Sequence, residues 1–198
     1  MTLSNPPRLI LASASPRRRS LLEEAGFSFL VEPSGVDEET AQNLYPIDLA
    51  MHLAIAKADA VAARFPDDVI LAADTVVALG DLSLGKPRDE QDAARMLKLL
   101  AGTTHLVITG MAVVRQSASH HALTKVMSAV HMRLLTDAEI VRYVATGDWI
   151  GKAGGYGIQD GDAFVKKVSG CYTNIVGLPV KTAARLLSEA GIEPARGR

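Results

Sequence analysis

Apolar positions along this chain alternate between short continuous runs, typical of buried strands, and runs with helical spacing. The short runs predict strands at residues 9–11, 27–31, 69–77, 105–114, 126–135 and 163–168. Helical spacing and capping residues predict helices at residues 16–26, 46–65, 89–100, 137–147 and 179–190. This alternation is typical of an α/β domain with a sheet flanked by helices.

Length and charge narrow the classes of protein. A chain of 198 residues without repeats or linkers predicts one domain over residues 1–198, at most divided into two closely packed lobes, with a frayed tail at 193–198. A net charge of −1 argues against a nucleic-acid partner or a membrane surface and favours a small ligand. The single cysteine, Cys171, and the lack of a signal peptide or membrane span favour the cytoplasm.

The first strand and helix carry the first chemical signal. Ser15 is a suitable N-cap and Pro16 a suitable first helical residue, so Arg17 and Arg18 fall on the first turn. Cations at a helix N-terminus lose stability unless they share an anionic ligand, and phosphate fits. The alternative is a solvated basic face that includes Arg19.

Two acidic positions follow predicted strands. Asp74 is expected to end the apolar strand of residues 69–77, where ligands of open α/β sheets collect. Glu38, beside Asp37, lies in an acidic loop whose oxygens suit Mg²⁺ or Mn²⁺. A turn-forming Asp and a solvated loop are the structural alternatives.

Two lysines extend the basic set. Lys57 lies one turn from Leu53 and from Val61 on an otherwise apolar helix, so it needs an anionic partner unless it snorkels from the edge of that face. Lys86 ends GDLSLGK, which is not a P-loop because Pro87 replaces the hydroxyl residue. It can meet a phosphate from a loop or be an ordinary exposed lysine.

The remaining motifs are less specific. His105, at the start of a strand, has the position of a structural histidine, and the sequence lacks an HExxH pair, a CxxC pair and a G-x-S-x-G elbow. In the glycine-rich loop 151–161, Tyr156 and Gln159 offer an aromatic face and an amide suited to reading a base. A flexible hairpin loop is the alternative.

Taken in order, the segments LASASPRRRSLL, VDEE, AIAKA, AADTVV, GKPRD, THLVITG, GKAGGYGIQDGDAFVKKVSG and NIVGLP resemble the Maf family of nucleoside triphosphate pyrophosphatases nearly end to end. The resemblance implies a Maf/ITPase-like α/β fold: an elongated, bent mixed β-sheet flanked by helices, with two lobes and a central cleft. It also implies cleavage between the α and β phosphates with a divalent metal cation, Mg²⁺ or Mn²⁺, and it allows a homodimer.

The resemblance assigns roles to individual residues. Asp74 corresponds to the proton acceptor, and with Glu38 it is the candidate metal ligand. The expected phosphate-binding residues are Ser15, Arg17, Arg18, Lys57 and Lys86. The positions that differ between subfamilies, Arg17, Thr75 and Gln159, match the set associated with dTTP and UTP rather than 7-methyl-GTP.

Two rival functions remain at this stage. One is a regulatory nucleotide-binding protein linked to septum formation, which would need the cations but not Asp74. The other is a phosphatase acting on nucleotides, whose product would be orthophosphate.

Overall fold

The computed structural model describes residues 6–41, 43–159 and 164–195. The strands are β1 (Leu9–Leu11), β2 (Leu30–Val31), β3 (Val69–Leu79), β4 (Leu82–Leu84), β5 (Thr104–Arg115), β6 (His120–Met132) and β7 (Val165–Ser169). The helices are α1 (Pro16–Glu24), α2 (Pro46–Ala62), α3 (Glu90–Leu100), α4 (Asp137–Thr146), α5 (Tyr172–Val176) and α6 (Val180–Glu189). Short 3-10 turns lie at η1 (Glu38–Ala41), η2 (Gln116–Ala118) and η3 (Ala153–Gly155).

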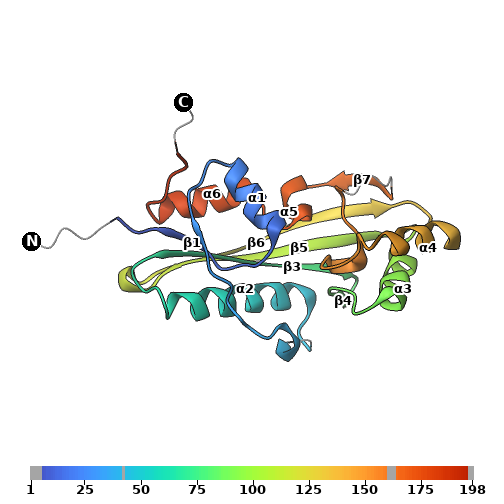
Figure 1. Cartoon of the computed structure of the whole chain (residues 1–198), viewed down its shortest axis with the longest axis horizontal. Coiled ribbons are helices and arrows are strands. Elements are labelled where there is room, and N and C mark those ends of the chain that lie inside the picture. The colour runs from blue at the N-terminus through green and yellow to red at the C-terminus, as the bar shows by residue number, and fades with distance from the viewer. Residues whose placement is uncertain (1–5, 42, 160–163, 196–198) are drawn as a thin grey trace, which may run out of the picture.

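The strands of the described chain form one mixed sheet in the order β2-β1-β3-β5-β6-β7, with β4 on the free edge of β3. β1 is parallel to β2 and to β3, and the other pairings are antiparallel. The long strands β3, β5 and β6 run the length of an elongated molecule (Figure 1). This architecture confirms the predicted α/β fold with a mixed sheet flanked by helices.

Helices cover both faces of the sheet (Figure 1). Alternate residues of a strand point to opposite faces, and β3 follows this rule. Ile70 and Ala72 pack in the apolar cluster under α2, whereas Leu71 and Ala73 pack with α6 residues on the other side. A separate apolar cluster joins α3 and α4 to the far end of the sheet. The alternation decides which way each side chain of the candidate site points.

Capping residues set the helix ends as the sequence predicts. Ser15 accepts the Arg18 N–H with Pro16 at the first helical position, and Thr136 and Glu139 form a capping box at α4. α2 ends at Ala62 rather than near residue 65. Among the described helices, none is both long and apolar enough to cross a membrane.

Several strand boundaries differ from the predictions. β2 is only Leu30–Val31, because Phe27 packs into the core outside any strand. β6 begins at His120 rather than near residue 126, since its polar half pairs with β5 after a tight turn at Ser119. β7 covers Val165–Ser169, and residue 163 lies outside the described residues.

The described part of the carboxyl-terminal tail lies against the end of α1. The backbone N–H of Ala195 donates to the carbonyl oxygen of Gly26 at 2.8 Å. Gly26 has a φ of +84°, a conformation that suits glycine at the end of α1. Residues 196–198 lie outside the described residues.

Candidate functional site

A cavity of about 1290 Å³ opens where the free edge of β3 changes partners. Pairing with β1 ends at Leu71, and pairing with β4 begins at Val77. Asp74 and Thr75 lie between these points and line the cavity. The expectation that Asp74 ends its strand is wrong, because β3 continues to Leu79 through its pairing with β5. Asp74 instead lies just beyond the carboxyl end of β1, which leaves the edge of β3 open.

The α2 side of this opening is built from charges. Lys57 projects from α2 and is 7% exposed, and its Nζ donates to Asp74 Oδ1 at 2.5 Å and to Glu38 Oε1 at 2.7 Å. Both carboxylates therefore meet one buried ammonium. The anionic partner predicted for Lys57 is present, and the alternative that it snorkels to solvent is wrong.

Gly110 allows α2 to lie close enough for this contact. It pairs with Asp74 across β3 and β5, and a Cβ at residue 110 would overlap the carbonyl group of Ala50 in α2. The strand pattern alone marks Gly110 only as a small residue. The close approach of the helix explains why a side chain is excluded there.

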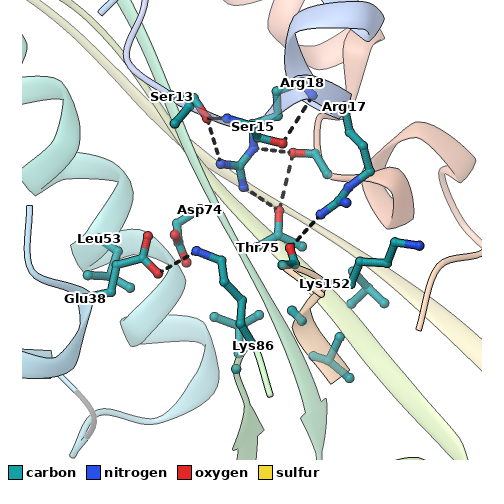
Figure 2. Close-up of a pocket in the computed structure, with 18 of the residues that line it drawn as sticks. Ser13, Ser15, Arg17, Arg18, Glu38, Leu53, Asp74, Thr75, Lys86 and Lys152 are labelled. Carbon is teal, nitrogen blue, oxygen red and sulfur yellow. Dashed lines mark hydrogen bonds and ion pairs between the residues drawn. The ribbon is translucent and has the colours of Figure 1, made fainter. Parts of the chain in front are cut away.

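Lys86 joins the same group of charges from the loop after β4. Its Nζ donates to Glu38 Oε2 (Figure 2), at a distance of 3.1 Å. The Lys86 side chain is 57% exposed. Desolvation raises the pKa of Glu38, but the hydrogen bond and charge of Lys57, together with Lys86, bring it below its usual value. α3 begins only at Glu90, so the backbone around Lys86 is not that of a P-loop.

The opposite side of the opening is built from neutral hydrogen bonds around Arg18. Its Nη2 donates to Thr75 Oγ1 at 3.0 Å, and its Nη1 donates to Ser13 Oγ at 3.3 Å (Figure 2). Its Nε donates to the carbonyl oxygen of Gly177, after α5, at 2.8 Å. These three acceptors are uncharged, so they orient the guanidinium while leaving its positive charge available to a ligand.

The side chain of Arg17, also on α1, points to a different part of the cavity wall from that of Arg18. Its Nη2 donates to the carbonyl oxygen of Gly151 at 2.9 Å, in the loop before η3. Ser15, the N-cap of α1, lies on the cavity wall with both arginines. The two arginines thus line one cavity, as a shared ligand requires, but their side chains contact different elements.

The glycine-rich loop separates into two parts. Gln159 is exposed and lines the cavity, and residues 160–161 lie outside the described residues. Tyr156 borders the cavity but is 6% exposed, and its hydroxyl lies 2.6 Å from His105 Nε2. Burial raises the pKa of Tyr156 and lowers that of His105 to about 4. His105 is therefore structural, as predicted, and Tyr156 contributes more to the core than to a base pocket.

Glu38 and Asp74 are the residues of this site whose carboxylate oxygens a divalent cation would need. Glu38 and Asp74 already hold one cationic group between them, and both supply hard oxygen donors. Among the described residues, no cluster of three or more His, Cys, Asp or Glu residues could hold a metal ion. A metal at this site would need further oxygens from a phosphate ligand or water.

Sequence reasoning missed the residues that support Arg18. Ser13 and Gly177 lie within segments that carry the family resemblance, but nothing in the sequence distinguishes their hydrogen-bonding roles. α5 was missed because five residues are too few for a periodic pattern.

Comparisons with known proteins identify the family of this chain. The model of the Maf family, described as Maf-like protein, matches residues 8–190. A dTTP/UTP pyrophosphatase from Anaeromyxobacter dehalogenans is 48% identical over 93% of this chain and 95% of its own. The dTTP/UTP pyrophosphatase of Deinococcus radiodurans is 45% identical over 97% of each chain, and that of Pelotomaculum thermopropionicum is 44% identical over 92% of this chain and 96% of its own.

Among solved structures, a HAM1 protein from Coxiella burnetii aligns with 64% of this chain and 73% of its own chain. The sequence identity is 14% and the TM-score is 0.39. Membership of a family is therefore decided by the family model and the sequence relatives, and not by the likeness to the HAM1 protein.

Proposed function

Because this chain belongs to the Maf family, we propose that it hydrolyses dTTP and UTP between the α and β phosphates, releasing the monophosphate and pyrophosphate. The observation that carries the proposal is the pair of adjacent residues on β3. Asp74 faces a buried ammonium, and Thr75 faces an oriented guanidinium. One cavity thereby combines a carboxylate that can take a proton with cations that can hold a polyphosphate.

Asp74 is the proposed proton acceptor. Lys57 fixes its Oδ1, which leaves Oδ2 to accept a proton from the attacking water. The water oxygen bonds to the α phosphorus, and the bond from that phosphorus to the α–β bridging oxygen breaks. Pyrophosphate leaves with the bridging oxygen and its electron pair.

The cations bind and orient the triphosphate. Arg18 keeps its charge for the ligand because its protein partners are neutral, and Lys86 is exposed enough to move from Glu38 to a phosphate. Arg17 and Ser15 border the same space. Charge placed where the leaving pyrophosphate gains negative charge lowers the barrier to cleavage.

A divalent cation, Mg²⁺ or Mn²⁺, is part of the proposal. Glu38 and Asp74 would hold it, because they are the two carboxylates that share one cationic partner. When bound, the metal supplies positive charge to the phosphate oxygens.

Base selection is proposed to involve Arg17, Thr75 and Gln159. All three line the cavity. A glutamine amide can donate to a pyrimidine carbonyl and accept from its ring N–H, whereas the cationic 7-methylguanine ring favours a carboxylate. Pyrimidine triphosphates are therefore the expected substrates.

The test is a substrate panel with product analysis. Purified protein is given dTTP, UTP and 7-methyl-GTP with Mg²⁺ or Mn²⁺, and pyrophosphate and orthophosphate are measured separately. We expect pyrophosphate equal to the monophosphate, with kcat/KM highest for dTTP and UTP. Gln159→Glu should narrow the gap to 7-methyl-GTP.

Each rival function has its own signature in this panel. Stepwise release of orthophosphate would identify a phosphatase. Nucleotide binding without turnover under either metal would identify a regulatory protein. A higher kcat/KM for 7-methyl-GTP than for both pyrimidine triphosphates would overturn the proposed base preference.

A further inference from the structure

A chain of buried hydroxyl and amide groups continues from Thr75 into the protein, away from the cavity. Thr75 Oγ1 lies 2.9 Å from Thr109 Oγ1 on β5, the residue paired with it across the two strands. Thr109 is fully buried, and its hydroxyl lies 3.4 Å from the carbonyl oxygen of Asn174 in α5. Arg18 is thus connected through Thr75 to two elements behind the site.

The possible directions of these hydrogen bonds restrict what Thr75 can do. Arg18 can only donate, so Thr75 Oγ1 accepts from it. The Thr75 hydrogen then goes to Thr109, or to the carbonyl oxygen of Gly177 at 3.4 Å while Thr109 donates to Thr75. In both arrangements the Thr75 hydrogen is used inside the protein. Thr75 is therefore placed to orient Arg18 rather than to donate to a base.

The side-chain amide of Asn174 fixes the end of this hydrogen-bond network that lies farthest from the cavity. Asn174 Nδ2 donates to the carbonyl oxygen of Val107 on β5 at 2.9 Å and to Ser128 Oγ on β6 at 3.0 Å. Ser128 Oγ also donates to the carbonyl oxygen of Cys171 and accepts its N–H. These bonds attach α5 to the sheet, and α5 leads directly to Gly177, whose carbonyl oxygen holds Arg18 Nε.

We propose that Thr109 is a positioning residue: its hydroxyl fixes Thr75 and, through Thr75, sets the Arg18 guanidinium for the nucleotide phosphates. The inference rests on the proposed function, in which Arg18 binds phosphate. Thr109 is fully buried between Thr75 and α5, so it acts through its neighbours rather than on the ligand.

The variant that tests the inference is Thr109→Val, which keeps the shape of the side chain and removes the hydroxyl. The fold should tolerate it, because the carbonyl oxygen of Asn174 also accepts the Gly177 N–H and Thr75 can donate to the carbonyl oxygen of Gly177. Thr75 then competes with Arg18 Nε for that oxygen. Loss of one hydrogen bond in such a network should raise KM for dTTP by about fivefold to tenfold, with kcat changed less than about twofold.

Two variants serve as controls. Thr109→Ser restores the hydroxyl and should return KM to within about twofold of the wild-type value. Thr104→Val removes a hydroxyl from the exposed start of the same strand, where it contacts His131, and should change neither constant. In an Arg18→Gln background, Thr109→Val should have no further effect on KM, because the group that it positions is absent.

An unchanged KM for folded Thr109→Val, or an undiminished effect in the Arg18→Gln background, would overturn the inference. If Thr109→Val does not fold, Thr75→Val is used in its place. It removes the same Thr75–Thr109 hydrogen bond at a half-buried residue and should give the same rise in KM. If the wild-type protein does not turn over dTTP, the proposed function fails on its own. The same variants are then compared by calorimetric titration with Mg²⁺ and inorganic pyrophosphate, where Thr109→Val should weaken binding by the same factor.

Discussion

Two consecutive residues of β3 face two different environments. Asp74 points to the α2 side, where Lys57 and Glu38 complete a group of opposite charges. Thr75 points to the other side, where Arg18 is held by hydroxyl and carbonyl oxygens. The carboxylate side neutralises its lysine through direct ion pairs. The hydroxyl side orients its arginine through neutral acceptors, while Asp74 and Glu38 attract the charge of that arginine electrostatically. We infer that the first side performs the chemistry through Asp74, and that Arg18 on the second side is the main cation that holds the phosphates, with Lys86 in support.

The largest effect is expected from Lys57→Met, which removes the ammonium shared by Asp74 and Glu38. Asp74 would then remain buried without its ammonium partner, while Glu38 would keep only Lys86. Breaking a buried ion pair in this way typically lowers the free energy of unfolding by about 4 kcal/mol. Urea unfolding at pH 7 measures the loss, and added Mg²⁺ should restore part of it. Lys98→Met, which removes an exposed ion pair with Asp137, should change stability by less than about 1 kcal/mol. Equal losses in the two variants would show that the charges beside α2 are not coupled through Lys57.

Gly110→Ala should disturb the side of the site next to α2 and leave the side around Arg18 in place. Gly110→Ala forces a methyl group against the carbonyl group of Ala50, and overpacking of this kind lowers the free energy of unfolding by about 3 kcal/mol. The displacement falls on α2, so kcat should drop while KM, set by Arg18, changes little. Gly85→Ala has open space around its Cβ and is the matched control for stability. An unchanged kcat in Gly110→Ala would show that the position of α2 does not govern the chemistry.

A pH series distinguishes the carboxylates beside α2 from His105, because the two respond to acid over different pH ranges. His105 has a folded pKa of about 4, so the unfolded chain binds a proton that the folded chain excludes between about pH 6.5 and 4. The contribution of neutral His105 to the free energy of unfolding is therefore complete above pH 6.5. It falls as the pH drops, by about 2 kcal/mol between pH 7 and 5. The carboxylate side responds at lower pH, because the pKa of Glu38 is lowered and its ion pair is lost only below its ordinary range. Urea unfolding of His105→Gln should show a smaller decrease over this interval, and exposed His52→Gln should match the wild type.

Much of the fold follows from the sequence, because continuous apolar runs and helix caps are local signals. The boundaries that were wrong depend on tertiary structure. Asp74 interrupts an apolar run without ending it, since pairing with β5 carries β3 to Leu79. β6 starts early because its polar half pairs with β5.

The candidate site divides in the same way. Arg18, Lys57 and Asp74 stand out because a charge on an apolar strand, an apolar helix or a helix N-terminus needs an explanation. Thr109 and Asn174 carry no such signal, since a threonine in a strand and an asparagine near a turn are ordinary. Their importance lies in contacts with residues far away in the chain, which only the fold reveals.

The separate roles of Asp74 and Arg18 are measured by comparing Asp74→Asn with Arg18→Gln for dTTP. Asp74→Asn should reduce kcat by about 10² to 10⁴-fold, while the dissociation constant of the nucleotide, measured without a divalent metal, stays within about threefold of the wild type. Arg18→Gln should raise that dissociation constant at least about tenfold. Near-normal turnover by Asp74→Asn, or equal losses of binding in both variants, would contradict the division between a side that reacts and a side that binds.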